Sequence, residues 1–88
     1  MSDVLFPLDI ALDCADLAGG SLDDVDGQWW FSVVLPGDRA AASATFVGHL
    51  VDSFADAYEI STERAFDLLR GSYSYRGGDV HFHGFDFF

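Results

Sequence analysis

Two histidines and an aspartate near the C-terminal end of the chain have the residue types and spacing of a metal site. Asp79, His81 and His83 occupy alternate positions, and alternate side chains of a β-strand point to the same face of a sheet. One carboxylate and two imidazoles form a ligand set that zinc and non-haem iron use. A single His-x-His pair is also common on ordinary exposed strands, and His49 is the only other histidine. The three residues are therefore a weak metal-site candidate, and the sequence predicts no cofactor.

Catalytic chemistry has little support in the sequence. Cys14 is the only cysteine, and its position among alternating apolar residues predicts a buried structural thiol rather than a nucleophile. No glycine-rich phosphate loop is present. Residues 24–27 begin like a calcium loop but lack its later ligands, so a fortuitous weak Ca²⁺ or Mg²⁺ site is the alternative there. We predict that the protein is not an enzyme.

Acidic residues dominate the charge of the chain. Fifteen Asp and Glu stand against four Arg and no Lys, which gives a net charge of −11 over 88 residues. Such an excess destabilises a small domain through self-repulsion, so the charge itself is a candidate for function. It excludes direct nucleic-acid binding, which needs cations to neutralise phosphates, and it excludes anionic membrane surfaces.

The acidic residues fall into two groups, which we predict to bind a partner. In a predicted long helix, Asp52, Asp56 and Glu59 follow at helical spacing and Glu63 continues the line; neighbours at this spacing are about 5–6 Å apart and repel each other. The second group lies in a predicted acidic loop, residues 13–26, and consists of Asp13, Asp16, Asp23, Asp24 and Asp26. Trp30 joins the candidates because an exposed tryptophan is a typical interface anchor. Burial of either Trp29 or Trp30 under a helix or a second subunit is an equal alternative.

Hydrophobic periodicity predicts the elements of the first half. Apolar residues fill the even positions from Val4 to Cys14, as in a half-buried strand. A helix from Pro7 to Ala18, ended by Gly19 and Gly20, is the alternative. Residues 13–26 are predicted to be a loop. Residues 28–35, rich in aromatic and β-branched side chains, are predicted to be a central strand.

The second half predicts two helices and a hairpin. Asp38 is placed to cap the long helix, and Ser61 to cap a shorter one. The long helix is expected to bury Phe46, Val47, Leu50, Val51, Phe54 and Tyr58, with Gly48 allowing close packing. The shorter helix is expected to bury Ala65, Phe66, Leu68 and Leu69. A hairpin over 73–88 turns at 76–79, and a change of apolar parity at Gly84 predicts a β-bulge.

These elements predict one α+β domain over residues 1–88. The expected fold is a small antiparallel sheet of about four strands in β-β-α-α-β-β order, with two helices on one face. The lone cysteine, and the lack of a signal-peptide pattern or of about 20 consecutive apolar residues, predict a cytoplasmic protein.

The charge predicts an acidic inhibitory binding protein that occludes the basic nucleic-acid-binding site of a partner protein or nuclease complex. In size, charge and lack of catalytic motifs, the chain resembles the small acidic DNA mimics that phages use against restriction or CRISPR systems. The resemblance covers no residue motif and implies a bacterial host cytoplasm. Alternatives are an immunity protein or antitoxin against a basic nuclease toxin, a small metal-binding protein using Asp79, His81 and His83, and a merely solvated or salt-adapted surface. The many aromatic residues are also compatible with a homodimer.

Overall fold

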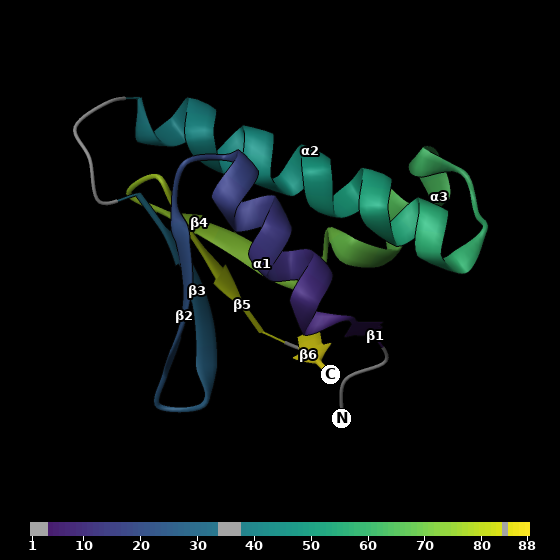
Figure 1. Cartoon of the computed structure of the whole chain (residues 1–88), viewed down its shortest axis with the longest axis horizontal. Coiled ribbons are helices and arrows are strands. Elements are labelled where there is room, and N and C mark those ends of the chain that lie inside the picture. Colours follow the sequence, from purple (N-terminus) through teal and green to yellow (C-terminus); the bar gives the residue numbers. More distant parts are fainter. Residues whose placement is uncertain (1–3, 34–37, 84) are drawn as a thin grey trace.

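The computed structural model describes residues 4–33, 38–83 and 85–88. The elements follow the chain in the order β1 (Val4–Phe6), α1 (Leu8–Leu17), β2 (Ser21–Val25), β3 (Gln28–Ser32), α2 (Arg39–Tyr58), α3 (Thr62–Leu69), β4 (Tyr73–Arg76), β5 (Asp79–Phe82) and β6 (Phe85–Phe87). The α+β class predicted from the sequence is confirmed (Figure 1).

Four strands form an antiparallel sheet in the order β2-β3-β5-β4. Two of its pairings, β2 with β3 and β4 with β5, are hairpins, while β3 meets β5 across the two helices between them. β3 therefore has a neighbour on each side, which confirms the predicted central strand over residues 28–32. The part predicted at residues 34 and 35 lies outside the described residues. A separate pair joins β1 to β6 in parallel.

The core lies between the helices and one face of this sheet (Figure 1). Phe31 of β3 stacks on Phe46 of α2 with ring centroids 4.2 Å apart, and Val80 lies opposite Phe31 in the sheet register. Phe6 joins β1 to the same core through Phe54, at 5.8 Å. α1 and α3 each pack on α2, so the long helix organises the helical layer.

The first segment is where the predicted fold is wrong. The predicted strand from Val4 to Cys14 is a three-residue strand followed by helix α1. Ala11, Cys14 and Ala15 are buried at helical spacing, while Leu12, expected inside, is exposed. The small buried side chains let α1 lie close against α2. Gly19, at φ 77°, ends α1 in the left-handed conformation that glycine favours.

The predicted acidic loop is also wrong, because residues 21–25 form strand β2. Asp26 and Gly27 adopt φ values of 53° and 78°, as in the Asp-Gly turn of a two-residue hairpin. Leu22 points into the core opposite Phe31. Gly20 is needed at the start of this strand, because a Cβ there would lie 2.5 Å from the Phe31 ring.

Both predicted helix caps are confirmed. The Asp38 carboxylate accepts a hydrogen bond from the Ala41 amide at 3.1 Å, and the Ser61 hydroxyl accepts one from the Arg64 amide at 3.1 Å. These bonds satisfy amides that the first turn of a helix leaves unpaired.

The predicted C-terminal hairpin is confirmed for β4 and β5 but not beyond. The segment after β5 leaves the sheet, and β6 pairs with β1 in the register Val4↔Phe85 to Phe6↔Phe87. Phe85 and Phe87 pack there against Phe6 and Phe82. The bulge predicted at Gly84 lies outside the described residues.

Candidate functional site: acidic surfaces and an aromatic groove

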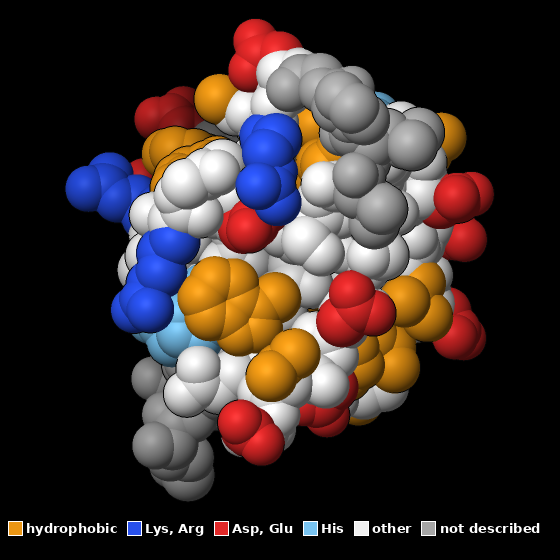
Figure 2. Space-filling model, turned by 90° about the vertical axis from the view of Figure 1, so that its left-hand side faces the viewer, with side chains coloured by type: hydrophobic (Ala, Val, Ile, Leu, Met, Phe, Trp, Pro, Cys, Tyr) orange, Lys and Arg blue, Asp and Glu red, His pale blue; other side chains and the backbone are white. Residues whose placement is uncertain are grey.

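The acidic side chains are almost all at the surface. Of the fourteen described Asp and Glu residues, thirteen are exposed and Asp79 is half-buried. Within the described ranges, ion pairs join only Arg39 to Asp79, at 2.7 Å, and Arg70 to Asp67, at 3.8 Å. Figure 2 shows basic side chains gathered toward one side of one face, with acidic side chains around most of its margin. Most of the negative charge is therefore unneutralised by the protein.

Four acids follow one another along the second half of α2 and the start of α3, and we call them the acidic stripe. Asp52 and Asp56 lie on α2, Glu59 is its C-cap, and Glu63 is in the first turn of α3; all four are exposed. Glu59 has φ 55°, a left-handed conformation that usually favours glycine at a helix end. Helical spacing puts Asp52, Asp56 and Glu59 on one side of α2, and Glu63 follows on the next helix.

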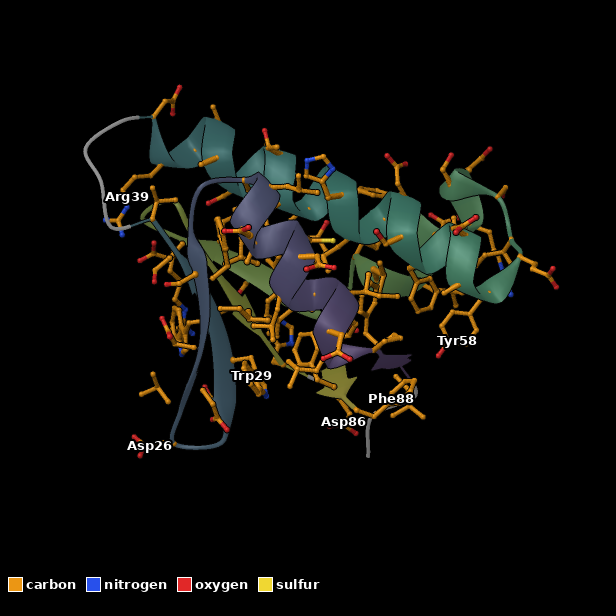
Figure 3. The ribbon with its side chains drawn as sticks, viewed as in Figure 1. Asp26, Trp29, Arg39, Tyr58, Asp86 and Phe88 are labelled. Carbon is orange, nitrogen blue, oxygen red and sulfur yellow. The ribbon has the colours of Figure 1, made fainter. Side chains whose placement is uncertain are left out.

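The second predicted group is not one patch. Asp13 and Asp16 lie on α1, Asp23 and Asp24 on β2, and Asp26 at the hairpin turn. Asp23 and Asp24 are adjacent on a strand and therefore point to opposite faces of the sheet. Figure 3 shows Asp26 at the tip of the β2–β3 hairpin, away from α2. These five residues were grouped because the sequence predicted a single loop over residues 13–26, and that loop does not exist in the structure.

Trp30 lies on the outer face of the sheet and is half-buried. Its ring stacks on His81 with centroids 4.3 Å apart, and the Arg76 guanidinium lies 5.6 Å from the ring centroid. Trp29 faces the other way and contacts Phe87, at 5.3 Å. Side chains of the protein itself therefore cover much of the Trp30 ring.

The three residues of the weak metal-site candidate lie in different environments. Asp79 pairs with Arg39, His81 is buried against Trp30 and hydrogen-bonded to Gln28, and His83 is exposed. No group of three His, Cys, Asp or Glu side chains in the part of the chain that the structure describes is placed to hold a metal ion.

Cys14 is buried in the α1–α2 contact, with its Sγ 3.6 Å from the Ser53 hydroxyl. Burial is the main cause that raises the pKa of the Cys14 thiol. A raised pKa keeps the sulfur protonated and a poor nucleophile.

A groove between α2, α3 and β4, which we call the aromatic groove, is absent from the sequence predictions. Its volume is about 440 Å³, and its lining includes Val51, Asp52, Phe66, Tyr73 and Tyr75. Phe66 was expected in the core but is 45% exposed, and Leu68 and Tyr58 are likewise exposed. Helix α3 has only eight residues and packs on α2 through Ala65 and Leu69, so the other two apolar side chains stay outside. The sequence did contain one sign of this groove, because the short helix α3 carries more large apolar residues than it can bury.

A second cavity of about 440 Å³ lies where α2 and α3 meet β1, lined by Leu5, Phe54, Tyr58, Ile60, Arg64 and Leu68. The Tyr58 hydroxyl donates a hydrogen bond to the Leu5 carbonyl at 2.7 Å. This bond ties the end of α2 to β1.

Comparisons with protein-family models, curated proteins and solved structures find no match to this chain. Within the described residues, no helix combines the length and the apolar character that crossing a membrane requires. Function is therefore inferred from the residues and their geometry.

Proposed function

We propose that this chain is an acidic inhibitory protein whose carboxylates occupy the basic nucleic-acid-binding site of a partner protein. The observation that best supports the proposal is the acidic stripe. Its four carboxylates are exposed, and no cation pairs with any of them among residues 4–33, 38–83 and 85–88.

The stripe destabilises the free protein in two ways. Like charges about 6 Å apart repel by roughly 0.7 kcal/mol in water, and such neighbours recur along α2 and α3. Glu59 also holds a left-handed conformation, which is unfavourable for a residue with a side chain. A cationic surface would offset the repulsion, so the stripe is better suited to a complex than to the free chain.

The mechanism follows from the charge. Lysine and arginine side chains that normally contact phosphates would contact carboxylates instead, and nucleic acid could not occupy the same surface. The field of a −11 protein would attract a basic partner over several ångströms, which gives fast association that slows with salt. Because the proposed interaction is competitive, nucleic acid should displace the protein.

Affinity capture tests this proposal. The folded chain is immobilised, bacterial lysate is passed over it, and bound proteins are eluted with a NaCl gradient or with duplex DNA or RNA. We expect nucleic-acid-binding proteins that salt releases and that nucleic acid displaces. Captured proteins that nucleic acid does not displace would contradict the proposal, and a single nuclease bound through a salt-resistant contact would favour the antitoxin alternative.

Two charge-matched variants locate the binding surface. Asp52→Lys with Asp56→Lys reverses two charges of the stripe, while Asp9→Lys with Asp86→Lys reverses two exposed charges elsewhere. We expect the first double variant to lose capture and the second to keep most of it. Equal losses in both would show that net charge, not the stripe, attracts the partner.

A further inference from the structure

The aromatic groove has the lining that a cationic side chain requires. Val47 and Val51 of α2, both largely buried, form the apolar floor of the groove. Phe66 of α3 and Tyr75 of β4 supply rings, and Asp52 supplies a carboxylate. The aliphatic stem of a lysine or arginine packs well on the valines, and its positive charge is attracted by the aromatic rings and the carboxylate.

The rings are accessible to a ligand. Phe66 is 45% exposed and Tyr75 is 51% exposed. Tyr75 meets Tyr73 edge-on, with centroids 5.8 Å apart and planes at 89°. A cation near an aromatic face is stabilised by the negative charge of the ring face, and perpendicular rings offer a face and an edge together.

Gly48 points to close approach by something outside the chain. It lies inside the 20-residue helix α2, lines the groove, and would have nothing within 4 Å of an added Cβ. The sequence predicted that Gly48 allows close packing within the protein, but the packing of the described residues does not require glycine there. Glycine nevertheless costs about 1 kcal/mol relative to alanine in a helix. Without a Cβ, the helix backbone is open to a ligand at this point.

We propose that the aromatic groove binds an arginine side chain of a protein partner. The guanidinium would stack on the exposed rings and pair with Asp52, while the methylenes lie on Val47 and Val51. Arginine suits the site better than lysine because its guanidinium is planar and weakly hydrated. A purely apolar side chain suits it less, because it would desolvate the Asp52 carboxylate without compensation. This inference rests on the proposed function, in which a basic protein supplies the arginine.

Peptide titration tests the groove directly. The full chain, labelled with ¹⁵N, is titrated with acetyl-Gly-Arg-Gly-amide, and amide shifts are followed by NMR. We expect millimolar binding, since a single side chain makes the contact, with the largest shifts at Gly48, Asp52 and Tyr75. The same peptide with citrulline, which has the shape of arginine but no charge, and a leucine peptide serve as controls. Equal binding of either control would overturn the proposal.

Neighbouring acids on α2 provide matched variants. Asp52→Asn removes the carboxylate that lines the groove, whereas Asp56→Asn removes one a helical turn away. We expect the arginine peptide to bind roughly three- to tenfold more weakly to the first variant and unchanged to the second. Tyr75→Thr, which keeps a strand-forming residue, should also weaken binding. Gly48→Ala should weaken binding while its thermal midpoint stays at or above that of the wild type, so misfolding is not the cause. Equal weakening by Asp56→Asn would show nonspecific attraction and contradict the groove.

The peptide experiment and the capture experiment fail separately. If the arginine peptide does not bind but nucleic acid still displaces captured proteins, the groove proposal is wrong and the proposed function stands. If the peptide binds specifically but nothing captured is displaced by nucleic acid, the groove recognises arginine in a different kind of partner.

Discussion

His81 is nearly fully buried, at 6% exposure, although it lies on the outer face of the sheet. Its Nε2–H donates to the Gln28 Oε1 atom, while Nδ1 is buried with no partner among the described residues. Burial, and then the positive charges of Arg76 and His83, lower the pKa of His81 below its usual value of 6.5. Protonation would place a second N–H in a buried position without an acceptor.

The lowered pKa predicts that acid destabilises the fold through His81. Between the folded-state pKa and 6.5 the unfolded chain binds more protons than the folded chain, so stability is retained above pH 6.5 and is lost as pH falls through the folded-state pKa. We expect His81→Phe, which keeps a ring against Trp30, to remove this loss. Urea unfolding at several pH values between 7.5 and 4.5 measures it, and the difference between the two proteins cancels the effect of the shared carboxylates.

His49→Gln is the matched control, because it keeps both His81 and His83 and changes a histidine on helix α2. It should follow the wild type. Identical pH dependence in His81→Phe and the wild type would contradict the role assigned to His81.

At the scale of elements, Glu59 is the point where helix stability and charge conflict. Glycine at this left-handed C-cap removes the strain of φ 55° and one like charge. We expect Glu59→Gly to raise the free energy of unfolding by about 1 kcal/mol and to weaken capture of the partner. Chemical denaturation measures the first effect, and Glu59→Gln separates charge from conformation, because glutamine removes the charge but leaves a long side chain in the left-handed conformation. Lower stability in both variants would show that the Glu59 carboxylate stabilises the helix end.

The elements predicted correctly are those with local signals. Asp38 and Ser61 identify helix starts because capping depends on one side chain and nearby amides. The β1–α1 segment was mistaken because alternating apolar residues fit a strand, whereas the small Ala11, Cys14 and Ala15 fit a helix only against α2. Local signals for α1 and β2 were nevertheless present: the glycine pair after Ala18 favours a helix end, and Asp26-Gly27 favours a hairpin turn. The alternating apolar pattern was given more weight. Pairing of β6 with β1 depends on residues about eighty positions apart, and no local pattern predicts it.

For the whole molecule, the excess of exposed acids predicts that salt stabilises the fold. Charges 10 Å apart repel by about 0.4 kcal/mol in water, and this distance is close to the Debye length at about 0.1 M salt. We expect the free energy of unfolding to rise by about 1 kcal/mol between 20 and 500 mM NaCl, measured by urea unfolding. The rise should be smaller in the Asp9→Lys, Asp86→Lys variant. Stability that falls with salt would show that the few ion pairs outweigh the repulsion.

The candidate site, like the elements, was predictable only where local signals in the sequence determine it. Most of the acidic stripe follows from spacing within one helix, so the sequence predicted that Asp52, Asp56 and Glu59 share one side of α2. The aromatic groove required knowing that β4 lies beside α2 and α3, which places Tyr75 near Phe66 and Asp52. Such neighbours come from tertiary packing, and single-chain periodicity does not contain them.

The parallel pairing of β1 with β6 has a mechanical consequence. The Leu8 amide donates to the Phe88 carbonyl at 2.7 Å and the Phe88 amide to the Phe6 carbonyl at 3.0 Å, which extends the ladder at the end of the chain. A force that pulls residues 4 and 88 apart acts at the start of β1 and at the end of β6. Because the two strands are parallel, they must slide past each other, and all these hydrogen bonds bear the load together. A hairpin pulled apart at its open end loses its bonds one by one. A force that pulls residues 4 and 88 apart therefore loads the β1–β6 pair in shear, the geometry in which a short ladder resists most strongly.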